Sequence, residues 1–307
     1  MAGEPLLTRN WSVPDAYRLP VYEQRGGYKA ARKALGMTPA DVIAEVKKAN
    51  LRGRGGAGFP AGVKWGFINA AAPTKYLVVN ADEGEPGTFK DRALMERDPH
   101  QLLEGCIIAS YAIGAHHCYI YIRGELVKAA KNLTAAIAEA RARGYLGKNC
   151  LGRPFELEIT VHRGAGAYIC GEETALLESL EGKRGEPRLK PPFPAVVGAF
   201  GQPTIVNNVE TISAVTHVLE MGGDAFAALG VPGDGGQRIF CLSGHVKKPG
   251  LYELAVGTPL RALIYEHGGG IREDRALKAV IPGGSSTPVL LPEHIDAPLS
   301  VEGLKAV

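Results

Sequence analysis

Residues 76–88 read Tyr-Leu-Val-Val-Asn-Ala-Asp-Glu-Gly-Glu-Pro-Gly-Thr, an apolar run that passes into an acidic turn. A short continuous apolar run bounded by turn residues is typical of a buried strand. Residues 117–122 and 155–161 predict two more strands, and helical patterns over 99–114 and 125–143 separate the three. This alternation predicts parallel βαβ units in a three-layer α/β sandwich. Such sheets bind ligands beyond the carboxyl ends of their strands, where the acidic turn lies.

Further elements flank this sheet. Thr38-Pro39-Ala40-Asp41 has the order of a helix start, with Thr as N-cap, Pro first and a carboxylate third, and the helix runs to about Asn50. Other helices begin within 170–176 and near Asn207. The stretch 222–236, rich in glycine, predicts a linker.

After the linker the pattern is that of a small mixed α/β module. Short strands near 238–243 and 251–254, a helix near 259–266 and a strand over 277–281 predict a β-grasp outline. The sequence contains no internal repeat that would indicate a solenoid or an array.

Composition excludes several classes of protein. Hydrophobic residues make up 45% and charged residues 22%, which is ordinary globular usage and excludes an intrinsically disordered chain. The net charge of +3 argues against binding to nucleic acid by neutralising phosphates. No apolar run approaches the roughly 20 residues that cross a bilayer, so we expect membrane contact only through partners. Five cysteines without a Cys-x-x-Cys pair, and a start without a secretory signal, predict a chain that stays in the reducing cytosol.

Glycine is the unusual component, at 40 of 307 residues, and much of it is clustered. The cluster Gly53-Arg-Gly-Gly-Ala-Gly58 matches the dinucleotide pattern GxGxxG, but it follows a predicted helix rather than a strand, which argues against a standard Rossmann turn. Backbone amides here, with Arg52, Arg54 and Lys64 nearby, favour a phosphate cradle of another kind. A purely structural loop remains an alternative, whereas the packed elements on both sides disfavour an RNA-binding RGG tail.

Two acidic clusters are candidate ligand sites. Asp82, Glu83 and Glu85 could serve as metal ligands, as a solvated loop, or as acceptors for the hydroxyl and amide groups of a ligand. Glu172 and Glu173 stand at the start of a predicted helix, where a pyrophosphate would favour a bare N-terminus. These two carboxylates could read hydroxyls, such as a ribose diol, or simply cap the helix.

Aromatic rings lie inside the same loops, at Phe59, Phe67, Tyr168 and Phe193. Each could stack on a flat ligand or pack into the core. The sequence has no visible Ser-His-Asp or Cys-His arrangement that would support hydrolysis, and we expect the isolated cysteines to be small buried hydrophobes.

Five strings of this sequence resemble one known family. They are RGRGGAGFPAGVKW at 52–65, NADEGEPGTFKD at 80–91, GAGAYICGEETAL at 164–176, PRLKPPFP at 187–194 and TIVNNVET at 204–211. Through them the chain resembles, over nearly its whole length, the NADH-binding FMN flavoprotein subunit of bacterial respiratory complex I, the family of F subunits of NADH-quinone oxidoreductases. The resemblance implies a Rossmann-like three-layer sandwich with a parallel sheet, followed by a β-grasp, soluble-ligand-binding domain.

The resemblance also implies a chemistry and a set of binding residues. Hydride passes from nicotinamide C4 of NADH to N5 of FMN, and no side chain is needed as a catalytic acid or base. The positions that match FMN contacts are Gly53, Arg54, Gly55, Lys64, Asn80, Asp82, Glu83, Gly171, Asn207 and Asn208. The positions assigned to NADH are Phe59, Phe67, Glu85, Tyr168, Glu172, Glu173, Lys190 and Phe193. Glu173 resembles the carboxylate that reads the adenine ribose, which favours NADH over NADPH.

The family continues into a helical bundle whose Cys-x-x-Cys-x-x-Cys motif and a later Cys bind a 4Fe-4S cluster, and this sequence has no such motif. We therefore expect a truncated chain without metal ligands of its own. Its expected domains are an N-terminal segment with the flavin loop (1–61), the FMN- and NADH-binding domain (62–229) and an incomplete β-grasp domain (230–307).

The implied partners are the thioredoxin-like 2Fe-2S subunit and the large iron-sulfur subunit of complex I. The implied location is the cytoplasmic inner face of the cell membrane, reached through the complex.

Two alternatives remain: the diaphorase subunit of an NAD-reducing hydrogenase or NAD-dependent formate dehydrogenase, and a non-enzymatic adaptor that docks partners. The short segment before Arg25-Gly-Gly-Tyr28 favours complex I over a diaphorase, because diaphorases often carry a fused amino-terminal ferredoxin-like domain.

Overall fold

The computed structural model describes residues 4–307. Within that range β1 (Tyr76–Ala81), β2 (His117–Ile122), β3 (Glu158–Arg163) and β4 (Thr204–Asn208) form a parallel sheet in the order β3-β2-β1-β4. Asn80 near the end of β1 is in register with Tyr121 of β2 and with Asn208 of β4. The strands therefore end at one common edge, as the α/β prediction requires.

Most of the helices pack around this sheet, and the last one, α11, lies near the C-terminus. They are α1 (Leu19–Gln24), α2 (Lys29–Ala34), α3 (Pro39–Lys48), α4 (Ala61–Trp65), α5 (Lys90–Arg97), α6 (Pro99–Ile113), α7 (Val127–Ala142), α8 (Glu173–Leu180), α9 (Val209–Met221), α10 (Gly223–Ala227) and α11 (Val301–Lys305).

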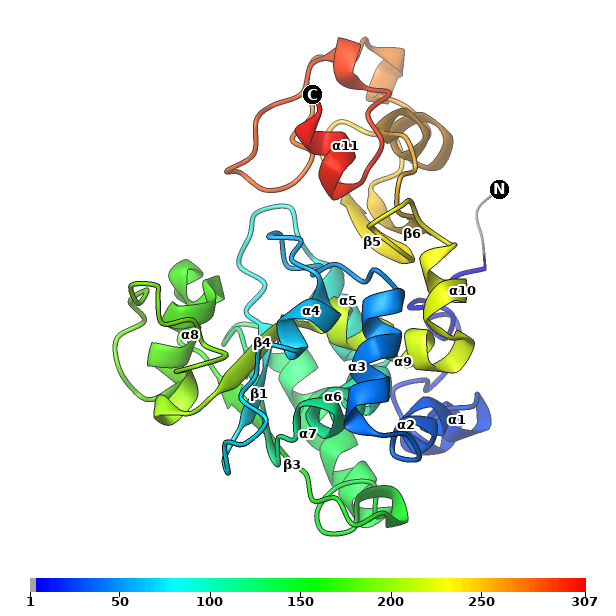
Figure 1. Ribbon diagram of the computed structural model, residues 1–307. Helices are drawn as coiled ribbons and strands as arrows, with labels where there is room; N and C mark the ends of the chain where they lie inside the picture. Colours follow the sequence, from blue (N-terminus) through cyan, green and yellow to red (C-terminus); the bar gives the residue numbers. More distant parts are fainter. Residues whose placement is uncertain (1–3) are drawn as a thin grey trace.

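Alternate side chains of β1 enter two separate apolar clusters. Leu77 and Val79 belong to the larger cluster, to which α3, α6, α7 and α9 contribute. Val78 faces the opposite way and packs with Leu176 and Leu177 of α8. Figure 1 shows α8 on one side of the sheet and the larger group of helices on the other. This period-2 alternation produces the three layers.

Local signals predicted several elements well. The predicted N-cap Thr38 accepts a hydrogen bond from the Asp41 amide at 3.2 Å, and α3 begins at Pro39. The strand predicted over 117–122 has the observed bounds, and the strand predicted from residue 76 ends at Ala81.

Other predictions are wrong in detail. The strand predicted over 155–161 begins at Glu158, because the Cys150 amide donates to the Phe155 carbonyl at 2.8 Å and closes a turn there. The strand β4 is not among the predicted elements, since its apolar run is only Ile205 and Val206. The stretch predicted as a linker contains α10, whose Gly223 amide donates to a Glu45 carboxylate oxygen at 2.8 Å.

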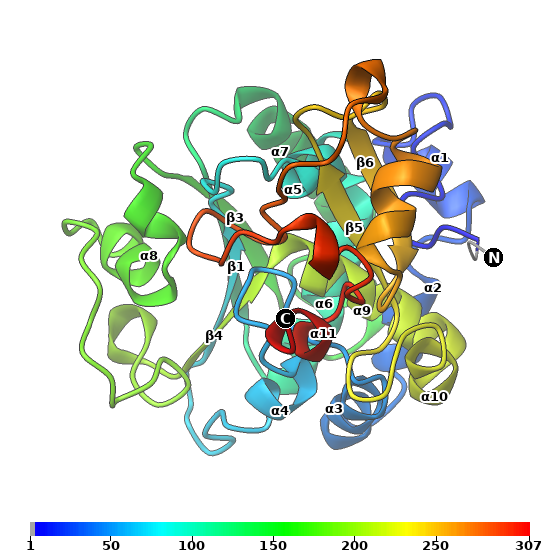
Figure 2. The ribbon, with the colours of Figure 1, turned by 90° about the horizontal axis from the view of Figure 1, so that it is seen from above.

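Residues 237–307, called the C-terminal unit below, have an apolar core of their own. β5 (Gln237–Leu242) pairs antiparallel with β6 (Gly250–Ala255), and a π-helical turn follows at Ala262–His267. The C-terminal unit lies above the carboxyl edge of the sheet in Figure 1, and Figure 2 looks down on it.

The strand predicted over 277–281 is wrong. Among the described residues this stretch pairs only through an isolated bridge between Val280 and Leu290. Ile281 is exposed, and Pro282 has no amide hydrogen with which to extend the ladder.

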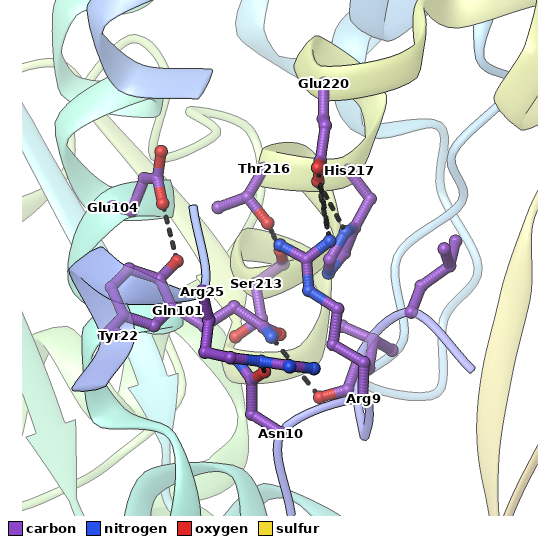
Figure 3. A network of polar contacts seen from close by, with 12 residues as sticks. Arg9, Asn10, Tyr22, Arg25, Gln101, Glu104, Ser213, Thr216, His217 and Glu220 are labelled. Carbon is purple, nitrogen blue, oxygen red and sulfur yellow. Dashed lines mark hydrogen bonds and ion pairs between the residues drawn. The ribbon is translucent and has the colours of Figure 1, made fainter. Parts of the chain in front are cut away.

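Residues 4–28, called the N-terminal strap, connect the C-terminal unit to the helices. The Glu253 carboxylate of β6 accepts hydrogen bonds from the amides of residues 6–8 at 2.8 to 3.0 Å. Arg9 then pairs with Glu220 of α9 at 3.0 Å, as Figure 3 shows. The strap therefore contacts both parts of the molecule.

The strap also reaches buried carboxylates of α6 and of the turn before it. Tyr22 donates its hydroxyl to Glu104, a contact also drawn in Figure 3, and the Asn10 amide donates to Asp98 at 2.9 Å. Burial of both carboxyls raises their pKa values, to about 7 for Asp98. Among residues 4–307 no helix is both long and apolar enough to span a membrane.

Candidate functional site

At the carboxyl edge of the sheet, a side chain of β1 meets the backbone that leads into α8, and a side chain of β4 meets α4. Asn80 donates from Nδ2 to the Gly171 carbonyl at 2.8 Å, and its Oδ1 accepts from the Asp82 amide at 3.1 Å. On β4, Asn207 Oδ1 accepts from the Trp65 indole at 2.8 Å. We call this region the strand-end site. It brings together predicted residues that are distant from one another in the sequence.

Residues 52–60, called the glycine loop, lie close over Asn208. A Cβ on Gly55 would lie 3.1 Å from the Asn208 Cβ, which is tighter than an ordinary side-chain contact. Asn208 is also the N-cap of α9, because its Oδ1 accepts from the Glu210 amide at 2.9 Å. The absence of a side chain at Gly55 allows the loop backbone to approach the end of β4 this closely, and the phosphate cradle expected here stays a prediction.

The Arg54 side chain does not face the strand ends. Its guanidinium is buried, pairs with Asp234 at 3.0 Å and donates to the Gly235 carbonyl at 2.7 Å. Burial lowers the pKa of Arg54 to about 10, so it remains a cation at neutral pH. Its backbone amide donates to the Thr211 hydroxyl at 2.8 Å, so both amide and side chain hold the glycine loop in place.

One carboxylate oxygen of Asp82 is buried and accepts no hydrogen bond from the described residues. Its Oδ2 has no hydrogen-bond partner among the side chains and backbone of residues 4–307. Burial raises the pKa of Asp82 to about 6, although Arg123 opposes the shift. Because leaving a buried acceptor unpaired is costly, a ligand with hydroxyl or N–H donors fits this position. FMN carries such donors on its ribityl chain and its ring.

Glu83 follows on the same loop and faces α5. Its two oxygens accept from the amides of Asp91 and Arg92 at 2.8 and 2.9 Å. Burial, reinforced by the Asp91 charge, raises the pKa of Glu83 to about 7. Asp91 in turn accepts from the Asn208 amide at 2.7 Å, so the loop after β1 and the end of β4 share one polar network.

Lys64 and Glu173 form an ion pair beside this edge. Lys64 donates to Glu173 and to the Val206 carbonyl of β4, both at 2.9 Å. Lys190 bonds the other oxygen of Glu173 at 2.9 Å. Burial opposes the charge on Glu173, but these lysines lower its pKa on balance, so it remains a carboxylate.

Glu172 is the N-cap of α8. One of its oxygens accepts from the amides of Thr174 and Ala175 at 2.7 and 2.9 Å, and the other accepts from Lys190 at 3.0 Å. Although burial works against it, these bonds lower the pKa of Glu172 to about 2. The sequence allowed Glu172 either to read ligand hydroxyls or to cap the helix, and in the structure it caps the helix.

Exposed aromatic rings line the loops around the strand-end site. Phe59 and Phe67 have ring centroids 6.0 Å apart and are 47% and 59% exposed, and Phe193 is 57% exposed. Tyr168 is exposed as well and donates its hydroxyl to Glu85. Rings of this size are usually more buried, so these positions favour contact with a flat ligand over packing into the core.

Some residues of the site were not singled out from the sequence. Trp65 orients Asn207, Thr211 holds the glycine loop, and Asp91 holds Asn208. All three residues lie in the strings that carry the family resemblance. Their contacts could not be predicted from those strings, because their partners are distant in the sequence. Among residues 4–307 no group of three or more His, Cys, Asp or Glu side chains is arranged to hold a metal ion.

Comparison with known proteins gives the family. Residues 46–217 match the Nuo51 FMN-binding domain, and residues 239–290 match the SLBB domain. An F subunit of NADH-quinone oxidoreductase in Rhizobium meliloti (strain 1021) is 56% identical over 305 residues, which cover 99% of this chain and 72% of that protein. This chain belongs to the family of F subunits of NADH-quinone oxidoreductases.

Another member of this family and one solved structure are also similar to this chain over nearly its whole length. The corresponding protein of Aquifex aeolicus (strain VF5) is 51% identical, over 97% of this chain and 70% of that protein. A chain of an NAD+-reducing nickel-iron hydrogenase in its H2-reduced state has a TM-score of 0.83 at 39% identity. The match covers 98% of this chain, which spans about half the length of the hydrogenase chain, 49%. The family and the α/β fold class predicted from the sequence are confirmed.

Proposed function

We propose that this chain accepts a hydride from NADH onto FMN and delivers the electrons singly to iron-sulfur clusters on the way to quinone. The observation that carries the proposal is the buried Asp82 oxygen, without a partner among residues 4–307, at the strand ends inside the matched FMN-binding domain. The glycine loop lies over the same edge, and the absence of a side chain at Gly55 lets its backbone come close to Asn208.

FMN would be held by three groups of residues. The glycine loop, with Gly53 and Gly55, would receive the phosphate, and Arg54 would hold this loop in place through its amide and its guanidinium. Asn80, Asp82, Glu83 and Gly171 would bond the ribityl chain and the ring, together with Lys64, Asn207 and Asn208. When bound, FMN takes a hydride from NADH and releases electrons one at a time. The chain itself positions the two cofactors and excludes water.

NADH would bind on the rim of the strand-end site. Phe59, Phe67 and Phe193 would stack on the adenine, and Glu85, Tyr168 and Lys190 would bond the remainder of the dinucleotide, beside the cap Glu172. The charged Glu173 would accept from the adenine ribose hydroxyl and repel a 2′-phosphate, which favours NADH over NADPH.

The chain would work inside a larger assembly. Family membership implies a place in the NADH dehydrogenase complex. The specific contacts we propose are with the thioredoxin-like 2Fe-2S subunit and the large iron-sulfur subunit, on the cytoplasmic face of the membrane. A 4Fe-4S cluster is expected for the family, and this sequence contains no Cys-x-x-Cys motif that would bind it.

A diaphorase of a hydrogenase is the second candidate. The observation in its favour is the structural match to the NAD+-reducing hydrogenase at 39% identity, against 56% for the Rhizobium relative. Both candidates carry out the same half-reaction between NADH and FMN, so the identity of co-purifying subunits separates them.

The test is anaerobic reduction of the reconstituted chain. Purified protein is loaded with FMN and titrated with NADH, and in parallel with NADPH, while the flavin absorbance is recorded. We expect bleaching by NADH at much lower concentration than by NADPH. Failure of the folded chain to bind FMN would contradict the proposal and favour the adaptor, and equal bleaching by both nucleotides would contradict the role of Glu173.

A further inference from the structure

Glu85 is held from two sides by groups that lie far apart in the sequence. The Tyr168 hydroxyl donates to one carboxylate oxygen, and the Ser285 amide of the C-terminal unit donates to the other. Tyr168 and then Ser285 lower the pKa of Glu85, so it stays charged. The loop after β1 is therefore in contact with the C-terminal unit at a position assigned to NADH.

The donor Ser285 belongs to a closed turn, residues 284–287. Both the amide and the hydroxyl of Thr287 donate to the Gly284 carbonyl, at 3.0 and 2.7 Å, which fixes the turn. At the base of the same loop Val280 and Leu290 exchange two backbone hydrogen bonds at 2.8 Å, and Leu290 is buried in the core of the C-terminal unit. The hydrogen bonds within the turn and at its base thus hold the Ser285 amide in a position to donate to Glu85.

Glycine at position 284 is required by the contact. A Cβ on Gly284 would lie 2.8 Å from both Cδ and Oε1 of Glu85, closer than real side chains approach. Any other residue would push the carboxylate away from Tyr168 or move the turn. Figure 1 shows the orange loop of the C-terminal unit reaching toward the cyan loop after β1, in agreement with this contact.

A carboxylate has about four acceptor positions, and the two donors described here leave room for donors of a ligand. Holding a long acidic side chain in one rotamer before binding removes an entropic cost that the ligand would otherwise meet. We propose that the turn 284–287 positions Glu85 for NADH, so that the C-terminal unit contributes to dinucleotide affinity. This inference rests on the proposed function of the strand-end site as an FMN and NADH site.

The experiment measures equilibrium binding on the full 307-residue chain loaded with FMN. The variants are Gly284→Ala, which crowds the carboxylate, and Ser285→Pro, which removes the amide hydrogen. Ser286→Ala is the matched control, because Ser286 is an exposed neighbour in the same turn. The affinity for NAD+, which does not reduce the flavin, is measured by titration calorimetry, and the affinity for FMN by flavin fluorescence.

We expect each turn variant to weaken NAD+ binding about 3- to 10-fold, with FMN affinity and Ser286→Ala within about twofold of the unaltered chain. In a Glu85→Ala background, Gly284→Ala should change NAD+ affinity less than about twofold, because the side chain that the turn positions has been removed. Additive effects in this cycle would point to a general structural role and overturn the inference.

The two proposals fail in different ways. If the unaltered chain binds neither FMN nor NAD+, the proposed function is contradicted. If it binds both, and Gly284→Ala and Ser285→Pro bind NAD+ as tightly as Ser286→Ala, the inference about the turn is overturned while the proposed function stands. Should Ser285→Pro fail to fold, Gly284→Ala and the cycle with Glu85→Ala still decide the question.

Discussion

The carboxylate of Glu253 and the amide of Thr8 are joined at 2.8 Å across 245 positions of the sequence. The same carboxylate accepts the Thr8 hydroxyl at 2.8 Å and the amides of Leu6 and Leu7. One side chain of β6 thus satisfies three successive backbone donors of the N-terminal strap. Hydrogen bonds to an ionised acceptor are about twice as strong as neutral ones.

We predict that Glu253→Gln lowers the free energy of unfolding by about 1–3 kcal/mol, because the amide that replaces one oxygen cannot accept. Chemical denaturation followed by circular dichroism measures the change. Glu266→Gln is the control, since Glu266 is exposed and lies in the same unit. Equal stability of the two variants would contradict the role of the strap.

Asp82→Asn should stabilise the FMN-free chain at neutral pH and weaken FMN binding. Folding raises the pKa of Asp82 from 3.8 to about 6, so the folded state binds more protons and stability falls as the pH rises through that window. With allowance for screening by solvent, the ionised carboxylate costs about 1–2 kcal/mol above pH 6. Unfolding at pH 4 and pH 7.5 should show this dependence in the unaltered chain and a smaller one in Asp82→Asn.

Glu173→Gln should reduce the preference for NADH over NADPH by about tenfold, because removing one charge next to Lys64 and Lys190 leaves those lysines free to attract a 2′-phosphate. The ratio of the two nucleotide concentrations that half-reduce the flavin measures this preference. Glu186→Gln, which alters an exposed carboxylate in the loop after α8, should leave the ratio unchanged. An unaltered ratio in Glu173→Gln would contradict the assignment.

Phe193→Ala should weaken NADH binding and leave FMN binding unchanged. Stacking of a base on an aromatic ring contributes about 1–3 kcal/mol, which corresponds to about 5- to 150-fold in affinity. Leu189→Ala is the control, because Leu189 is 92% exposed on the same loop and offers no ring. Because Phe193 is itself exposed, the thermal unfolding temperatures of both variants should stay close to that of the unaltered chain.

Local patterns predicted the elements whose causes are local. The strand that begins at Tyr76 follows from a continuous apolar run, and α3 follows from the cap at Thr38. β4 was missed because Ile205 and Val206 are too short a run, and its strand conformation depends on pairing with β1. Pairing of this kind joins residues that a local pattern does not compare.

For the site, the identities of the candidate residues could be predicted, but the directions of their side chains could not. The resemblance supplied its residues, and the structure brings Lys64, Glu173 and Lys190 into direct contact. The direction of the Arg54 side chain could not be predicted, because its partner Asp234 is 180 positions away. For Glu172 the residue type allowed two roles, and only the positions of the Thr174 and Ala175 amides distinguish them.

The ion pair between Arg54 and Asp234 has a consequence for attempts to divide the chain. A protein ended at residue 229 would keep the guanidinium in the glycine loop and lose the carboxylate that neutralises it. The same cut would remove the Gly235 and Gln237 carbonyls that accept from Arg54, so the guanidinium would lose its acceptors and part of its cover together. The conformation of the glycine loop, and with it the proposed phosphate cradle, therefore depends in part on residues beyond the matched FMN-binding domain.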